Sequence, residues 1–272
     1  MIKNISIGQY VPSDSPIHKL DPRTKIILSF LYMISIFFVN NFWGYIFFFL
    51  LIGIAIILSK LKASFILKGI KPILFLLIFT AVINIFVIKG EGLPILKFGF
   101  IEIYTEGLIR AAFMAIRLVM LIVGTSILTL TTSPIELTDG IETLLSPFKK
   151  IGLPAHELAM MMTIALRFIP TLMDETDKIM KAQMARGAEF ESGKLIERAK
   201  NLVPILVPLF INSFKRADDL ATAMEARAYR GGEGRTRMKV LKYRSRDFIA
   251  VSIFMIIILC GIMTRFMVGG II

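Results

Sequence analysis

The sequence predicts an all-α, polytopic membrane protein with about five transmembrane helices and a cytoplasmic domain of three helices, two of them long and tipped by arginine. Three observations predict this class. Apolar residues make up 56% of the 272 residues, whereas soluble domains contain about 45–50%. Several apolar runs approach the roughly 20 residues that a helix needs to cross a bilayer. One long segment between the last two runs is instead amphipathic and rich in charge.

Five apolar runs qualify as membrane-spanning helices. They cover about residues 24–40, 42–59, 70–88, 106–130 and 248–270. Only Asn40 and Asn41 separate the first two, which predicts a tight helical hairpin. The third run has Pro72 near its start and contains Asn84, a candidate for a hydrogen bond between helices.

Charged loops predict the orientation of the chain in the membrane. Basic residues precede the first span and join the second to the third: Lys19, Arg23, Lys25, Lys60, Lys62, Lys68 and Lys71. The loop after the third span instead mixes two lysines with three glutamates, and the long polar segment is again basic. Because loops rich in Lys and Arg stay in the cytoplasm, we expect a cytoplasmic N-terminus and an external C-terminus.

The predicted organisation has three parts: residues 1–131 with four transmembrane helices, a cytoplasmic domain at 132–247, and a C-terminal transmembrane helix at 248–272. The cytoplasmic domain should contain three helices. Ser133 and Pro134 provide an N-cap and a first helical residue for the first of them, which ends near Ser146-Pro147.

The second and third helices of this domain are long, at about 154–186 and 193–229. At 1.5 Å per residue each would extend about 45–55 Å. Charged residues interrupt both: Asp174, Glu175 and Asp177 in one, and Lys215, Arg216, Asp218 and Asp219 in the other. Such positions cannot cross lipid cheaply, but the apolar first halves (159–168 and 202–214) can pack under the membrane or against another membrane protein. Prolines 170, 204 and 208 are expected kink points.

Two triplets end these helices, Ala185-Arg186-Gly187 and Ala226-Arg227-Ala228. One interpretation is simply a helix C-terminus, where arginine favours the negative end of the dipole and glycine takes the left-handed cap. The repetition favours a second interpretation. Each arginine lies between small residues, so a partner's groove could close around a guanidinium that binds a carboxylate through two parallel hydrogen bonds.

Other charged residues carry weaker hypotheses. The basic run that ends at Arg244 and Arg246 is typical of a juxtamembrane anchor on anionic lipid, and in a membrane protein it explains the net charge of +12 better than nucleic-acid binding does. Arg110 and Arg117 share a face of the fourth span. Arg110 can snorkel, whereas Arg117 should face protein, either paired with a carboxylate or helix carbonyls or, alternatively, lining a substrate path.

No catalytic or metal-binding arrangement is evident in the sequence. His18 and His156 lie far apart without ligand spacing, and His156 fits a helix start. The glycine-rich stretch 231–236 lacks the Gly-Lys-Ser/Thr ending of a phosphate loop and follows a helix. Cys260 is expected to be a buried apolar residue. Met160-Met161-Met162 belongs either to a core or to an adaptable contact surface.

Three motifs resemble the transmembrane T component (EcfT) of energy-coupling factor (ECF) transporters, in the CbiQ/EcfT family. They are Ser15-Pro16-Ile17-His18-Lys19-Leu20-Asp21-Pro22-Arg23-Thr24-Lys25, Ala165-Leu166-Arg167-Phe168-Ile169-Pro170 and Gln183-Met184-Ala185-Arg186-Gly187-Ala188. The likeness spans the whole chain with order and spacing intact. One departure is that the second triplet ends in Ala228 where the family pattern has glycine; since this adds one methyl group, we expect docking to survive.

The resemblance implies a non-catalytic scaffold subunit of an ABC importer in the plasma membrane of a prokaryote. The triplets, with Arg186 and Arg227 at their centres, would dock two ABC ATPase subunits (EcfA and EcfA′). The partners would bind ATP and Mg, so this chain would hold no cofactor and no metal. A separate membrane-embedded S component would capture a vitamin or metal ion, and the 132–247 region would be the coupling domain.

Two rival functions remain open on the residues alone. A membrane enzyme acting on a lipid phosphate could use the basic run as its site, but it would need a general base or metal ligands there, and none is visible. A self-sufficient channel or carrier would need more polar residues in its spans than Asn84, Arg110 and Arg117. Flux measured with the chain reconstituted alone would discriminate, and the scaffold hypothesis predicts none.

Overall fold

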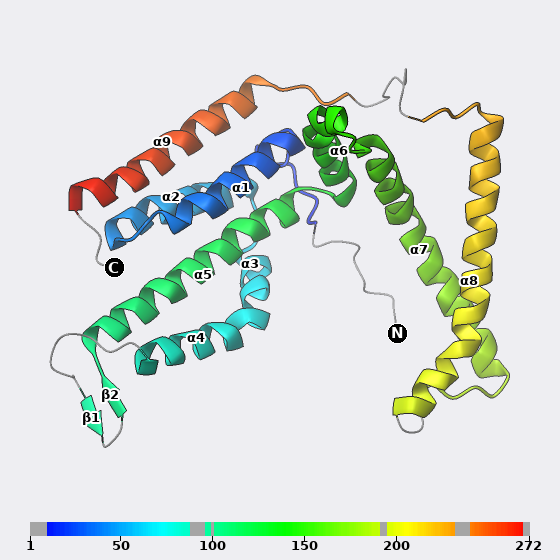
Figure 1. Ribbon diagram of the computed structural model, residues 1–272, viewed down its shortest axis with the longest axis horizontal. Helices are drawn as coiled ribbons and strands as arrows, with labels where there is room; N and C mark the ends of the chain where they lie inside the picture. Colours follow the sequence, from blue (N-terminus) through cyan, green and yellow to red (C-terminus); the bar gives the residue numbers. More distant parts are fainter. Residues whose placement is uncertain (1–9, 88–95, 99–100, 191–194, 232–239, 269–272) are drawn as a thin grey trace. The chain divides into compact units, whose positions relative to one another are not determined.

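The computed structural model describes residues 10–87, 96–98, 101–190, 195–231 and 240–268 (Figure 1). The chain divides into two compact units. A bundle unit comprises residues 8–140 and 240–272, and an arm unit comprises residues 1–7 and 141–239. The predicted boundaries at 131/132 and 247/248 concern which side of the membrane each segment occupies, and they stay a prediction.

The long helices of the bundle unit are α1 (Pro22–Phe37), α2 (Phe42–Ser59), α5 (Thr105–Thr131) and α9 (Ser245–Val268), and two shorter helices pack against α5. The core of this unit contains Tyr32, Ile36, Phe48, Phe113 and Met120, all at most 3% exposed. Tyr32 packs against Gly124, whose missing side chain leaves room for the ring, and its hydroxyl donates to the Met120 carbonyl at 3.1 Å. The bundle therefore joins α1 to α5 by close backbone approach.

The predicted membrane spans are largely confirmed. Four helical stretches of the described chain are long and apolar enough to cross a membrane: Phe42–Ser59, Ala63–Val87, Thr105–Thr131 and Ser245–Arg265. The first predicted span, by contrast, is shorter than expected. With 16 residues, α1 extends about 24 Å, less than the roughly 30 Å of a hydrocarbon core.

The third predicted span is broken into segments. A short helix, α3 (Ala63–Ile70), is followed by a 3₁₀ turn at Lys71–Ile73 and then by α4 (Leu74–Val87). Pro72 lies in the 3₁₀ turn, where its ring removes a backbone donor and disfavours the helical conformation of the preceding residue. As Figure 1 shows, α3 and α4 run in different directions.

Two short strands accompany the helices without changing the predicted all-α class. Strand β1 (Leu96–Phe98) pairs antiparallel with β2 (Ile101–Ile103), with Leu96 opposite Ile103. Three residues per strand give no alternating pattern long enough to stand out in a sequence dominated by apolar helices.

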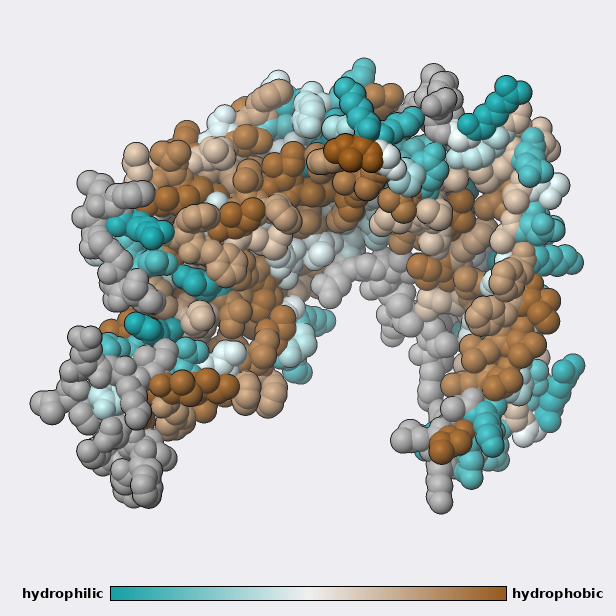
Figure 2. All heavy atoms as spheres, in the orientation of Figure 1, coloured by the Kyte–Doolittle hydropathy of each residue, from teal (hydrophilic) through white to brown (hydrophobic). Residues whose placement is uncertain are grey.

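The outer surface of the bundle unit is strongly apolar. Figure 2 shows hydrophobic side chains across its visible face. Phe30, Phe49 and Phe75 are 62, 63 and 78% exposed. A soluble monomer rarely exposes contiguous apolar surface on this scale, so this surface is suited to lipid or to another membrane protein.

Three helices follow α5, as predicted: α6 (Pro134–Leu145), α7 (Ala155–Ala185) and α8 (Leu195–Ala226), with a 3₁₀ segment at Ser146–Ile151. Ser133 caps α6 as expected, since its hydroxyl accepts from the Glu136 N–H at 3.3 Å. Helices α7 and α8 contain 31 and 32 residues, about 46 and 48 Å in length, and remain helical through their internal prolines.

Candidate docking site on the two long helices

The C-terminus of α7 places Arg186 at the cap position. Ala185 is the last helical residue, and Gly187 follows with φ +87°. The Gly187 N–H donates to Met184 O at 3.0 Å, and the Ala188 N–H donates to Gln183 O at 3.0 Å. These two hydrogen bonds define a Schellman motif, which satisfies carbonyls that the helix end would otherwise leave unpaired.

The C-terminus of α8 has the same motif. The Ala228 N–H donates to Glu225 O at 2.8 Å, and the Tyr229 N–H donates to Met224 O at 3.0 Å. Ala228 adopts φ +55°, a left-handed conformation that costs an L-residue roughly 1–2 kcal/mol. Arg227 therefore occupies the position in its motif that Arg186 occupies in the other.

Both arginine tips are accessible. All six residues of the predicted triplets, at 185–187 and 226–228, are exposed. Within the part of the chain that the structure describes, neither guanidinium forms an ion pair. Each tip thus offers a planar set of donors that a partner's carboxylate could take up in two parallel bonds.

Helices α7 and α8 pack together through a polar crossing. Glu175 accepts a hydrogen bond from Asn212 Nδ2 at 2.6 Å and forms an ion pair with Arg216 at 2.6 Å. Further along, Gln183 Nε2 donates to Pro204 O at 3.4 Å. Residues later in α7 contact residues earlier in α8, so the two helices run antiparallel at this contact.

The crossing places the two arginines symmetrically. Arg186 lies eleven residues beyond Glu175, and Arg227 lies eleven residues beyond Arg216. Each tip is therefore about 16 Å along its helix from the ion pair. Because the helices are antiparallel, the tips extend in opposite directions from the crossing, which suits two separate but equivalent partner sites.

Apolar side chains are exposed along α7 and α8, away from the arginine tips. On α8, Leu206, Phe210 and Phe214 are 47, 62 and 71% exposed, and the rings of Phe210 and Phe214 stack on each other. On α7, Met161 and Met162 are 54 and 45% exposed. Of the two interpretations of the methionine cluster, the contact surface therefore fits these two residues better than the core.

The structure also places the polar residues of the predicted spans. Arg117 donates to Tyr45 Oη at 3.0 Å and to Val39 O at 2.9 Å, so it binds a backbone carbonyl near the C-terminus of α1. Asn84 donates to Thr80 O within its own helix at 2.8 Å. Among the described residues Asn84 thus bonds within its own helix and not to another helix, since a side chain one turn away from a carbonyl can bond to it.

His156 and Cys260 lie outside the docking site. His156 lies at the start of α7, as expected, and its Nδ1 is 2.9 Å from Glu142 Oε1 of α6. Cys260 is exposed on α9, which corrects the expectation that it would be buried. Apolar side chains on this membrane-facing helix can face outward, so a hydrophobic run does not reveal which residues are internal.

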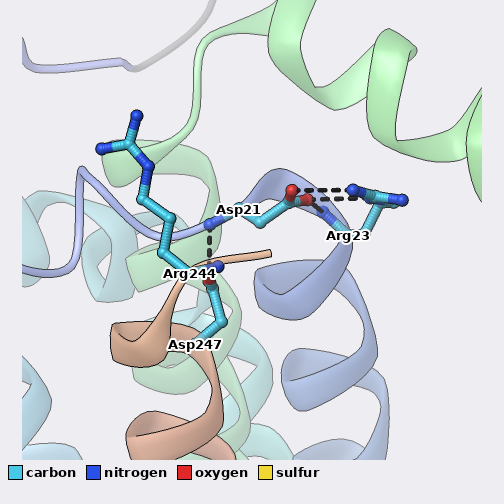
Figure 3. A network of polar contacts seen from close by, with 4 residues as sticks. All are labelled: Asp21, Arg23, Arg244 and Asp247. Atoms are coloured by element: carbon cyan, nitrogen blue, oxygen red, sulfur yellow. Dashed lines mark hydrogen bonds and ion pairs between the residues drawn. The ribbon is translucent and has the colours of Figure 1, made fainter. Parts of the chain in front are cut away.

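A polar network at the start of α1 was not anticipated (Figure 3). Arg23 donates through Nε and Nη2 to the two carboxylate oxygens of Asp21, both at 3.0 Å. The Asp21 N–H donates to Asp247 Oδ1 at 2.8 Å, and the Arg244 N–H donates to Asp247 Oδ2 at 2.8 Å. The Asp247 carboxylate thus fastens the start of α9 to the residue before α1, and Arg23 binds the side chain of that residue.

The fold and the candidate site define an all-α, polytopic membrane protein with two exposed, arginine-capped helix ends. Comparison with known proteins identifies its family. The family model described as "Cobalt transport protein" matches residues 13–238. The chain is 65% identical to the energy-coupling factor transporter transmembrane protein EcfT of Clostridium kluyveri over 97% of this chain and 98% of that protein.

Two more distant relatives have the same name. The Ruminiclostridium cellulolyticum protein is 58% identical over 93% of this chain and 94% of its own length. The Bacillus subtilis protein is 51% identical over 91% of this chain and 93% of its own length. The chain belongs to this family of ECF transporter transmembrane proteins, as the motifs predicted.

Proposed function

We propose that this chain is the transmembrane scaffold of an ECF-type importer. It would couple ATP hydrolysis by two ATPase subunits to movement of a membrane-embedded S component that captures a vitamin or metal ion. The observation that carries the proposal is the pair of matching Schellman caps, which expose Arg186 and Arg227 at equivalent positions. A helix end needs a cap but does not need the same exposed arginine twice.

The tips are suited to docking because of their chemistry. Arginine stays charged and presents its donors in a rigid fork that matches a carboxylate. The flanking alanines leave space for the walls of a groove to approach. Two tips that extend in opposite directions from one crossing fit two ATPase subunits, one at each tip.

The exposed apolar surfaces of α7 and α8 provide the contact surface for the S component. Phe210, Phe214 and their apolar neighbours on α8 are suited to contact a hydrophobic S component. When the ATPases close on ATP, the tips move and the two helices shift as levers against that component. The chain itself performs no catalysis in this scheme, and ATP with Mg is bound by the partners. The N-terminus would be cytoplasmic.

Charge reversal at both tips tests the docking role. The variant Arg186→Glu with Arg227→Glu should lose co-purification of the ATPases, while the chain still inserts in the membrane and still retains its S component. Removing one partner of a buried charge pair costs about 3–5 kcal/mol, so two reversals should reduce binding below detection in an affinity purification from native membranes.

A matched control separates docking from net charge. Lys178→Glu with Lys215→Glu makes the same change in charge at two exposed positions of the same helices, away from the caps. We expect this control to retain both ATPases. If the arginine variant keeps its ATPases, or if the lysine control loses them equally, the docking role of the tips is wrong.

A further inference from the structure

A cavity of about 340 Å³ lies in the bundle unit, bordered by α1, α2, α5 and α9. Its lining is almost wholly apolar. Tyr32 and Phe254 are buried in its wall, whereas Ile249 and Ile253 of α9 are 59 and 47% exposed. The cavity can therefore be reached from the outer, apolar surface of the bundle, where a membrane protein meets lipid.

One end of this cavity is cationic. The first lining residue on α1 is Lys25 and the first on α9 is Arg246, whereas Thr131 is the last on α5. Lys25 Nζ donates to Thr131 O at 2.9 Å, and the residue before α1, Asp21, bonds to Asp247 of α9. The charged ends of these helices thus meet at the same level.

The other end is hydrophobic and lies well away from the cations. The lining on α9 continues from Arg246 to Ile257, which is about 16 Å along the helix. At that depth the wall consists of apolar and aromatic side chains such as Phe254. A cavity with cations at one end and hydrocarbon along its length matches an anionic amphiphile.

The two cations lack a carboxylate partner within the described part of the chain. Neither Lys25 nor Arg246 forms an ion pair there. The nearby carboxylates of Asp21 and Asp247 accept from Arg23 and from backbone N–H groups. These two carboxylates and Glu136 act on Lys25 through their longer-range charge, without an ion pair. Lys25 is 5% exposed, and a buried cation without a counter-ion is costly.

We propose that the cavity binds an anionic phospholipid, with one acyl chain along the apolar lining and the phosphate held by Lys25 and Arg246. Lys25 has two of its three donors engaged, by Thr131 O and His18 O, which leaves one for the phosphate.

Native mass spectrometry of the full chain in detergent tests the proposal. The probes are dioleoyl phosphatidylglycerol, dioleoyl phosphatidylcholine with the same chains, and glycerol 3-phosphate with none. We expect one phosphatidylglycerol to be retained, phosphatidylcholine to bind about tenfold more weakly, and glycerol 3-phosphate not to compete.

Two variants and one control locate the site. Arg246→Gln should weaken phosphatidylglycerol retention about tenfold, and Ala250→Phe should abolish it by filling the cavity. Arg244→Gln is the matched control, because Arg244 belongs to the same basic run but does not line the cavity. Arg246 is exposed, so its substitution should leave the fold intact even if Ala250→Phe does not.

Three results would overturn the proposal. Equal retention of the two phospholipids would show that the cations select no headgroup. Displacement by glycerol 3-phosphate would indicate a free phosphate site with no role for the acyl chain. Equal losses in Arg246→Gln and Arg244→Gln would indicate diffuse attraction between lipid and the basic run.

Discussion

Ala228 has the left-handed backbone that Gly187 provides at the other tip, with φ +55° and +87° respectively. Glycine adopts this region without the steric cost that Cβ imposes. We therefore predict that Ala228→Gly stabilises the α8 cap by about 1 kcal/mol. Amide hydrogen exchange in the last turn of α8 should slow about fivefold, since that factor corresponds to 1 kcal/mol in a local opening equilibrium.

The reciprocal change at the first tip is the control for this prediction. A Cβ at Gly187 would meet nothing within 4 Å, so Gly187→Ala changes only the backbone preference. Exchange in the last turn of α7 should accelerate by a similar factor, about fivefold. If amide exchange changes in the same direction in both variants, the positive φ values do not determine the stability of these caps.

His18, in the segment before α1, should make the free energy of unfolding depend on pH. Ser15 Oγ lies 2.7 Å from its Nδ1 and Val11 O lies 3.0 Å from its Nε2, so a neutral ring protonated on Nε2 satisfies both partners. Burial lowers the pKa of His18 below its usual 6.5, and the nearby positive charge of Lys25 acts in the same direction, whereas the Val11 hydrogen bond and Glu136 oppose them.

A lowered pKa means that the unfolded chain binds the proton more tightly than the folded chain. The stabilisation by neutral His18 is therefore complete above about pH 6.5 and is lost as pH falls through the folded-state pKa. We predict that His18→Gln flattens the decline in thermal stability between about pH 6.5 and 5. An unchanged slope in this variant would assign the acid sensitivity to other groups.

At the scale of helices, the Glu175–Arg216 ion pair should hold the crossing of α7 and α8. The two side chains are 17 and 38% exposed, so solvent screens the pair and its coupling energy should be about 1 kcal/mol. A double-mutant cycle with Glu175→Gln and Arg216→Gln, read by thermal unfolding, measures that coupling.

A distance measurement tests what the crossing does for the tips. Spin labels at Ala188 and Tyr229, in a background where Cys260 is replaced by serine, report the separation of the two caps. We expect Glu175→Gln to broaden the distance distribution, because Glu175 also accepts from Asn212. Asn201→Ala, which removes a bond to Glu189 outside the crossing, should broaden it less.

Sequence periodicity predicted the long helices well and the short elements poorly. Helices α7 and α8 end within a few residues of the expected positions because arginine followed by a small left-handed residue is a local signal. The break at Pro72 was visible as a proline but not as the start of a separate helix. Strands of three residues, by contrast, have no periodicity to detect.

At the scale of the whole chain, long-range pairs account for what the sequence could not reveal. The triplets were evident as motifs, but their equal spacing from the Glu175–Arg216 pair depends on a contact between helices that no local pattern encodes. Asp21 and Asp247 meet across 226 residues of sequence, and Lys25 meets Thr131 across 106. The cationic end of the bundle cavity follows from those two contacts and therefore could not be predicted.

The paired tips yield a last prediction about docking geometry. If each guanidinium must face a groove, the direction of Arg227 around the α8 axis should matter more than its distance from the crossing. Two alanines inserted after Ala221 turn the tip by about 200° and advance it about 3 Å, whereas four turn it by about 40° and advance it about 6 Å. The two-residue insertion should therefore lose one ATPase in co-purification and the four-residue insertion should retain both. Loss that instead increases with the length inserted would mean that the reach of α8, and not the direction of its arginine, limits docking.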